Sequence, residues 1–270
     1  MARQPSFYIS HGGGPCFWMD FPPPIGPGGF DRLKAFLQGL PDLVPAPPAA
    51  WLVVSAHWEA EVPTVSAAAR PDMIYDYYGF PPMAYELQHP APGSPELAVR
   101  VHALLQDAGI EAAEDPVRGF DHGVFVPMMM VDPAARTPTV TLSLRHDLDP
   151  AAHIAIGRAL APLRDEGVVI VGSGSSFHDL RTYFDGRAEP AKSFDGWLVG
   201  AMTGDPASRE AALTGWEAAP GARACHPREE HLLPLMVAAG AGAGEAGHAV
   251  YRDIVGNKAF SGFAFGDVRG

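Results

Sequence analysis

Positive charge is scarce in this 270-residue sequence, which has 19 lysines and arginines against 31 acidic residues. The formal net charge is −12, and no basic stripe occurs along the chain. Nucleic-acid binding requires clustered Lys and Arg side chains that neutralise phosphates. We therefore expect no nucleic-acid partner.

Cysteines and long apolar runs are also scarce. The two cysteines, Cys16 and Cys225, have no C-x-x-C spacing and predict no disulfide framework, which fits a reducing cytosol. No apolar run reaches the roughly 18 residues that a membrane helix needs, and residues 1–5 do not resemble a signal peptide. We therefore expect a cytoplasmic protein without a membrane partner.

The residues that are abundant indicate a folded protein with long loops. Hydrophobic residues make up 47% of the chain and charged residues 19%, which is typical of globular proteins. The 30 glycines and 28 prolines concentrate in stretches such as 12–29 and 41–48. These stretches predict ordered loops that surround a compact core and shape a pocket.

Short apolar strands alternate with helical patterns along the chain, and no linker separates independent cores. Strands are predicted at 6–10, 50–56, 62–67, 139–144, 168–173, 248–255 and 260–265. Helices are predicted at 30–39, 95–108, 150–164, 190–203, 206–216 and 228–239. This alternation predicts an α/β fold with a mostly parallel central sheet flanked by helices.

Histidines follow three of the predicted strands. His11 and His57 come directly after strands, and His178 follows another through a turn of small residues. Strand ends of an open α/β sheet form one rim, where ligands bind, so these imidazoles can meet and hold a metal. Any one of them alone is equally compatible with a turn or core histidine, and His231, beside two acidic residues on a predicted helix, would alone be a surface residue.

The glycine- and serine-rich turn at 172–178 fails two motifs by one residue each. A dinucleotide-binding turn needs glycine where Phe177 stands, and a nucleophile elbow needs glycine where His178 stands. The turn therefore serves to deliver His178 to the rim. Asp179 and Arg181 are candidate neighbours of that histidine or of a substrate.

Two further features suggest a pocket. His122 lies between an acid and a glycine at a predicted loop-to-helix junction, a position from which a titratable group can face a cavity. The apolar run 124–130 after it is interpreted as core. The segment 74–85 is dense in aromatic rings, and it fits either a wall over a flat ligand or a loop packed on the surface.

Taken together, these motifs resemble the class III extradiol ring-cleaving dioxygenases, and most of all the 4,5-DOPA dioxygenase branch. The segments that carry the resemblance are 9–13, 55–59, 75–81, 120–123, 172–178 and 231–235. The resemblance implies a single catalytic domain over residues 1–270, with a metal site at the carboxyl ends of the strands.

The resemblance also implies roles for the histidines. His11, His57 and His231 correspond to metal ligands, and His231 stands where protocatechuate-type relatives have a glutamate. His178 corresponds to the catalytic acid/base and can also ligate the metal. His122 corresponds to a second catalytic histidine, which binds substrate or assists proton transfer. Three neutral imidazoles leave a divalent ion with its full +2 charge, which favours an anionic catecholate.

The implied activity is that of an oxidoreductase that adds both atoms of O2 to a DOPA-like catechol and opens its ring to a muconic semialdehyde. Fe(II) is the expected working metal, and Zn(II) can occupy the same site. Arg181 or Arg145 is expected to hold a substrate carboxylate. The alternatives are a zinc-dependent hydrolase, with His178 or Glu59 as base, and a non-catalytic metal-binding protein on the same fold. A non-catalytic binding protein is expected to lose metal-ligand side chains, and this chain retains them.

Overall fold

The computed structural model describes residues 2–269, which form an eight-stranded sheet with the order β4-β3-β5-β2-β6-β1-β8-β7. The strands are β1 (Ser6–Ser10), β2 (Ala50–Ala60), β3 (Thr64–Ser66), β4 (Ala113–Asp115), β5 (Thr139–Arg145), β6 (Val168–Gly174), β7 (Gly247–Val255) and β8 (Lys258–Phe265). The central strands β5, β2, β6 and β1 are parallel, whereas β3 pairs antiparallel with β5, and β8 pairs antiparallel with β1 and β7. The carboxyl ends of the four central strands therefore meet at one edge.

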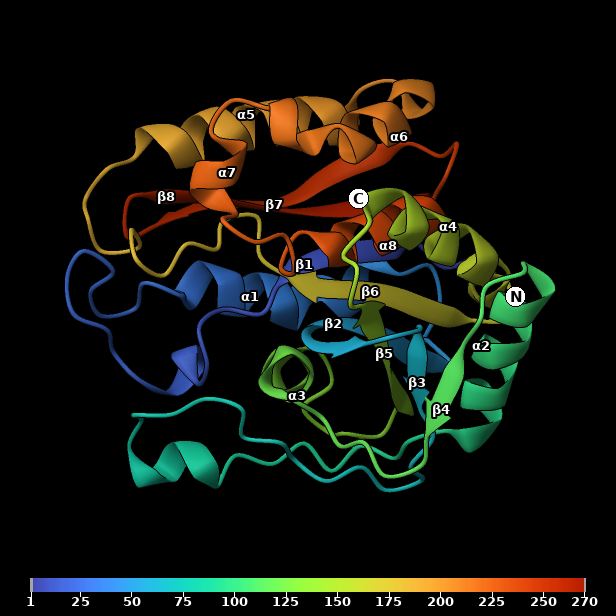
Figure 1. Ribbon diagram of the computed structural model, residues 1–270. Helices are drawn as coiled ribbons and strands as arrows, with labels where there is room; N and C mark the ends of the chain where they lie inside the picture. Colours follow the sequence, from blue (N-terminus) through green and yellow to red (C-terminus); the bar gives the residue numbers. More distant parts are fainter. Residues whose placement is uncertain (1, 270) are drawn as a thin grey trace.

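Helices cover both faces of this sheet (Figure 1). They are α1 (Asp31–Gly39), α2 (Pro95–Asp107), α3 (His122–Val131), α4 (Pro150–Leu160), α5 (Glu189–Thr203), α6 (Pro206–Thr214), α7 (Ala222–Cys225) and α8 (Leu233–Ala241). Side chains alternate along β6, so that Gly172 faces the α8 backbone while Ser173 bonds to the first turn of α3. Helices α8 and α3 thus lie on opposite faces of the strand that ends near His178.

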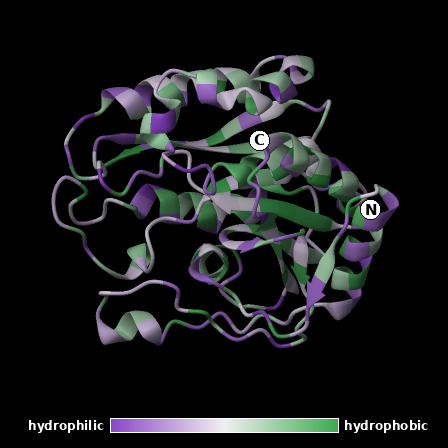
Figure 2. Cartoon of the chain, in the orientation of Figure 1, coloured by the Kyte–Doolittle hydropathy of each residue, from purple (hydrophilic) through white to green (hydrophobic). Residues whose placement is uncertain are grey.

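The core lies between these layers. All seven residues of β6 and all nine of α8 are buried, and the central strands and α8 are among the most hydrophobic segments in Figure 2. A helix that is apolar on every side must be enclosed, and α8 packs on β6 and β1 beneath α4. This packing holds the site-bearing strand ends rigidly. Within residues 2–269 there is no helix that is long and apolar enough to cross a membrane.

The predicted α/β architecture is confirmed, with local differences that include an unpredicted short helix α7 and a longer β2. The run at 124–130 forms most of α3, and the three-residue strand β4 was not predicted. Helix α8 begins at Leu233 rather than at residue 228, because Pro234 occupies its first turn. His231 therefore lies in the turn before a helix, and its predicted place on the helix is wrong.

Candidate metal centre

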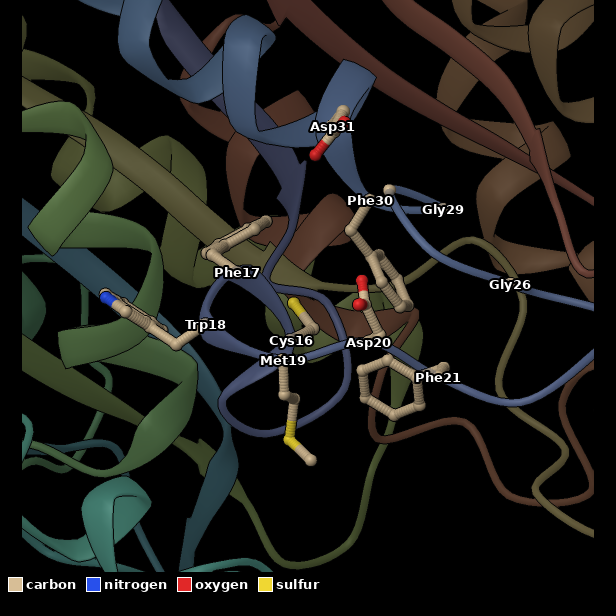
Figure 3. Close-up of a pocket in the computed structure, with 11 residues that line it drawn as sticks. Cys16, Phe17, Trp18, Met19, Asp20, Phe21, Gly26, Gly29, Phe30 and Asp31 are labelled. Carbon is tan, nitrogen blue, oxygen red and sulfur yellow. The ribbon is translucent and has the colours of Figure 1, made fainter.

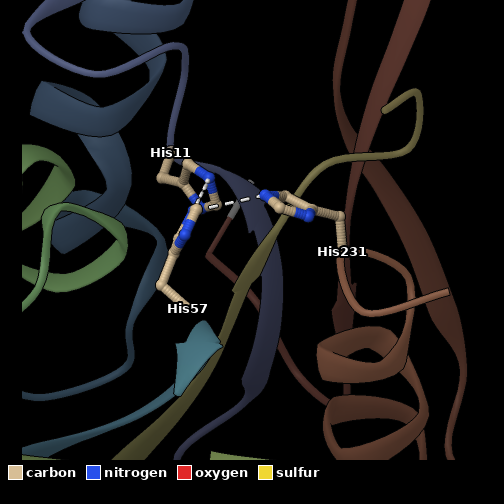
Figure 4. A group of neighbouring side chains, drawn as sticks. All are labelled: His11, His57 and His231. Atoms are coloured by element: carbon tan, nitrogen blue, oxygen red, sulfur yellow. Dashed lines mark hydrogen bonds between the residues drawn. The ribbon is translucent and has the colours of Figure 1, made fainter. Parts of the chain in front are cut away.

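Three histidines from distant parts of the chain converge on one point (Figure 4). His11 follows β1, His57 lies in β2 at a break in the strand register, and His231 lies in the turn before α8. The Nε2 atom of His57 is 3.1 Å from that of His11 and 3.2 Å from that of His231. Two imidazoles bound at about 2.1 Å to one tetrahedral ion hold their nitrogens roughly 3.3 Å apart. The three side chains therefore fit a shared metal ion.

The other two predicted histidines adjoin this group. The His178 ring stacks on the His231 ring with 3.3 Å between centroids, and the His122 ring lies 3.9 Å from that of His57. His122 also contacts His11 edge-on at 5.4 Å. All five histidines singled out in the sequence thus belong to one cluster at the carboxyl edge of the sheet.

Close backbone packing fixes the turn that carries His231. The His231 carbonyl accepts hydrogen bonds from the Tyr8 hydroxyl (2.8 Å) and from the Ser175 amide (3.0 Å). A Cβ atom on Gly174 would lie 2.1 Å from the same oxygen. Glycine at this position therefore lets the end of β6 touch the turn, which explains one of the small residues before His178.

The Glu230 carboxylate connects two of the rings, and sequence reasoning did not single it out. Its Oε1 atom accepts hydrogen bonds from Nδ1 of His178 (3.1 Å) and from Nδ1 of His231 (2.9 Å). Only 14% of the Glu230 side chain is exposed, and its second oxygen lies 3.6 Å from Arg228. One carboxylate thus orients two imidazoles through their Nδ1 atoms, so that their Nε2 atoms face away from it.

Asp76 plays the same part on the other side of the cluster. Its Oδ1 accepts from Nδ1 of His122 (2.8 Å) and from the His122 amide (2.9 Å), while Oδ2 lies 3.4 Å from Nδ1 of His57. His11 is held differently, since its Nδ1 donates to the Ser173 hydroxyl at 3.2 Å. Every ring in the cluster therefore has an Nδ1 partner, as metal-site histidines usually have.

The electrostatics of the cluster suit a cation. Burial lowers the pKa of His11 and His231 well below the usual range, and burial and the neighbouring His122 lower that of His57 to about 3. These rings are therefore neutral near pH 7 and present lone pairs. Burial opposes the ionisation of Glu230, yet the hydrogen bond from His178 gives a net lowering of its pKa. An ionised carboxylate next to the cluster helps to balance a metal's charge.

The cluster lies in the wall of a cavity of about 480 Å³. Tyr77, Tyr78 and Phe80 also line this cavity, so the aromatic segment forms part of its wall. The backbone of Gly12 to Gly14 lines it as well. A second hollow of about 380 Å³ is open to solvent, is lined only by residues between 16 and 31, and has no histidine in its wall (Figure 3).

Three other expected site residues lie outside the cavity wall. Arg145 pairs with Asp147, and Arg181 has a 79% exposed side chain that pairs with Asp179. Glu59 is bound by both terminal nitrogens of Arg228, at 2.5 and 2.6 Å. The expectation that either arginine holds a substrate carboxylate therefore has no support in this geometry, nor has Glu59 as a base.

The fold and site define an α/β protein with a histidine cluster that has the geometry of a metal site and opens into a pocket. Residues 8–264 match the family model described as the catalytic LigB subunit of aromatic ring-opening dioxygenase. The chain belongs to this family of extradiol dioxygenases, which confirms the resemblance drawn from the sequence.

Named relatives and a solved structure agree with this assignment. The chain is 40% identical to a 4,5-DOPA dioxygenase extradiol of Portulaca grandiflora, over 92% of this chain and 90% of that protein. It is also 40% identical to the dioxygenase tasH of Hapsidospora irregularis, over 89% and 79% respectively. The crystal structure of an uncharacterized Escherichia coli K12 protein, 31% identical, superposes with a TM-score of 0.78 over 98% of this chain and all of that one.

Proposed function

We propose that this protein is an extradiol dioxygenase that opens the ring of a catechol with O2 to give a muconic semialdehyde. The observation that carries the proposal is the convergence of three histidines on one point, with two more beside them, in the wall of a largely apolar cavity. The cavity is lined by residues from Ser10 to Phe260, so residues 1–270 act as one catalytic domain. Relatives named 4,5-DOPA dioxygenase support a catechol substrate.

His11, His57 and His231 are the proposed metal ligands, and His178 is close enough to serve as a fourth. The separations of their Nε2 atoms and their neutral state support these roles. Bound Fe(II) would supply the redox chemistry toward O2 that Zn(II) lacks, although the three imidazoles suit both ions. We therefore propose Fe(II) as the working metal.

His178 and His122 are the proposed proton-handling groups. Each donates its Nδ1 proton to a carboxylate, His178 to Glu230 and His122 to Asp76, which leaves Nε2 free to accept a proton. Both line the cavity, on either side of the ligand histidines. His178 would take a proton from a catechol hydroxyl, and either histidine would return one as the ring opens.

The aromatic wall would hold the catechol ring and exclude water. The centre of the Tyr77 ring lies 5.7 Å from that of His122 and 5.4 Å from that of Phe80. These three rings form part of the cavity wall. Stacking on such rings orients a flat substrate, and a dry site prevents loss of reactive intermediates to solvent. A hydrolase with Glu59 as base is less favoured, because Arg228 holds that carboxylate. A non-catalytic protein is less favoured, because all five histidines are present.

Oxygen uptake tests the proposal. Protein loaded with Fe(II) under anaerobic conditions is mixed with aerated catechol, and consumption of O2 is followed with appearance of a ring-opened product. We expect turnover in the wild type and in a His248→Ala control, which alters an exposed histidine on β7. No uptake with any catechol, together with metal-dependent ester hydrolysis, would favour a hydrolase instead.

A further inference from the structure

Beyond the histidines, most of the side chains that line the cavity are apolar or aromatic. Its apolar lining includes Ile25, Leu33, Phe177, Leu180, Phe184 and Phe260, of which Leu180 and Phe184 are exposed. A volume of about 480 Å³ lies within the range that accommodates whole drug-sized ligands. The space therefore exceeds the needs of a bare catechol and leaves room for a ring substituent.

No lysine or arginine within residues 2–269 lines this cavity. Lys258 lies behind the Phe177 ring, 5.2 Å from its centre, and its ammonium is bound to Asp185 at 2.8 Å. Its side chain is 3% exposed. Arg181 points to solvent and pairs with Asp179. A carboxylate on the substrate would thus have no cationic partner in this wall, and burying it against the apolar side chains would be costly.

Several hydroxyl groups of the wall are already engaged within the protein. Tyr77 donates its hydroxyl proton to the Ala84 carbonyl, and Ser175 donates to the Phe177 carbonyl at 2.8 Å. The carboxylate that lines the cavity is Asp76, whose charge would repel an anion. Apart from the Tyr78 and Tyr183 hydroxyls and the amides of the glycine loop, the wall therefore offers a substituent mainly apolar contact.

Resting on the proposed function, we propose that the substrate is a catechol whose ring carries an uncharged, apolar substituent, rather than an amino acid or a carboxylate. The metal and histidines would bind the two hydroxyls, which every catechol shares. The substituent would fill the outer, apolar part of the cavity toward Leu180 and Phe184, whose side chains are 69% and 53% exposed. This differs from the amino-acid substrate in the names of several relatives.

The test compares two ligands that differ only at one end. 4-Propylcatechol ends in a methyl group, and 3-(3,4-dihydroxyphenyl)propanoate ends in a carboxylate in the same position. Their dissociation constants are measured by calorimetry on metal-loaded protein without O2, with L-DOPA as a third ligand. We expect propylcatechol to bind at least about 10-fold more tightly than the propanoate or L-DOPA. Equal or tighter binding of either charged ligand would overturn the proposal and point to the glycine loop amides as anion donors.

A charge added at the cavity mouth gives a second test. Leu180→Arg is expected to improve propanoate binding and to reduce the preference for propylcatechol over the propanoate, because it supplies a cation where the substituent ends. Val117→Arg makes the same charge change at an 81% exposed residue outside the cavity and is expected to leave both constants unchanged. An unchanged preference in Leu180→Arg, or an equal effect in Val117→Arg, would count against the proposed position of the substituent.

Oxygen uptake on the same three ligands separates this proposal from the proposed function. Tighter binding of propylcatechol without uptake on any ligand would refute the dioxygenase activity and leave the apolar preference intact. Uptake on all three ligands with preference for the charged ones would confirm the activity and overturn the substrate class.

Discussion

Replacement of Glu230 by glutamine tests whether one carboxylate orients two histidines of the metal site. In the wild type, Oε1 of Glu230 accepts protons from Nδ1 of both His178 and His231. Glutamine keeps the size of the side chain but removes the charge and one acceptor. Its NH2 group would also occupy the place of Oε2, which is buried and has no hydrogen-bond partner among the described residues.

The expected effect is a weaker hold on the metal with the fold intact. Loss of a carboxylate that orients ligand histidines typically costs 10- to 100-fold in metal affinity, or about 1.4 to 2.7 kcal/mol. We expect Glu230→Gln to fall in this range, because one of the two rings it contacts is a proposed ligand. The same change should slow turnover at saturating metal, because the acceptor that holds Nδ1 of His178 loses its negative charge.

Chelator competition with Zn(II), which is inert toward O2, measures the affinity directly. The matched control is Glu229→Gln, since that carboxylate pairs with Arg223 at 2.6 Å and contacts no histidine of the cluster. Metal affinity in Glu230→Gln equal to that of wild type, or an equal loss in Glu229→Gln, would refute the orienting role.

Four further changes test other parts of the account. His57→Ala should lose the metal and all oxygen uptake, and a wild-type metal content would refute its role as a ligand. His178→Ala should keep the metal but lose at least about 100-fold in turnover, measured on one sample by metal analysis and oxygen uptake; wild-type turnover would refute its role as a base. Burial lowers the pKa of His226 to about 4. As the pH falls from about 6.5 to about 4, the unfolded chain therefore binds a proton that the folded protein does not bind. The free energy of unfolding then decreases by about 1.4 kcal/mol for each pH unit. His226→Gln should flatten the pH slope of the free energy of urea unfolding by this amount, and an unchanged slope would contradict the assignment. Gly174→Ala brings a Cβ to 2.1 Å from a carbonyl and should cost more than about 2 kcal/mol, whereas Gly200→Ala, at an open position of α5, should stabilise by up to about 1 kcal/mol; equal effects on the melting temperature would contradict the packing argument.

The fold could be predicted from the sequence where local patterns were strong. The central strands are β-branched runs bounded by turn residues, and helices such as α2 and α4 have a clear apolar face with proline in the first turn. The start of helix α3 was expected as a loop-to-helix junction at His122, but its extent was not predicted, because the helix is buried on most sides and its apolar residues have no helical period. Strand β4 is only three residues long and forms through pairing with β3, which local sequence does not encode.

The site residues could also be predicted only in part. Strand ends mark His11, His57 and His178, and a neighbouring acid and glycine mark His122. The role of His231 came from the family resemblance. Glu230 and Asp76 were not identified, since each acts on a histidine far along the chain: Glu230 lies 52 residues after His178, and Asp76 lies 46 residues before His122. Such contacts arise from tertiary packing. The sequence offered two signals for them: Glu230 is the acidic residue next to His231, and Asp76 is the acidic residue within the aromatic segment 74–85.

The central claim is that the histidine cluster adds dioxygen to a catechol ring. Mass spectrometry of the product formed under oxygen-18 gas, from unsubstituted catechol and from 4-propylcatechol, tests it most directly. The account predicts a ring-opened product heavier than the catechol by both atoms of one O2, formed by the Fe(II)-loaded wild type and absent with His57→Ala. An oxidised product without added oxygen, or the same product in His57→Ala, would contradict it.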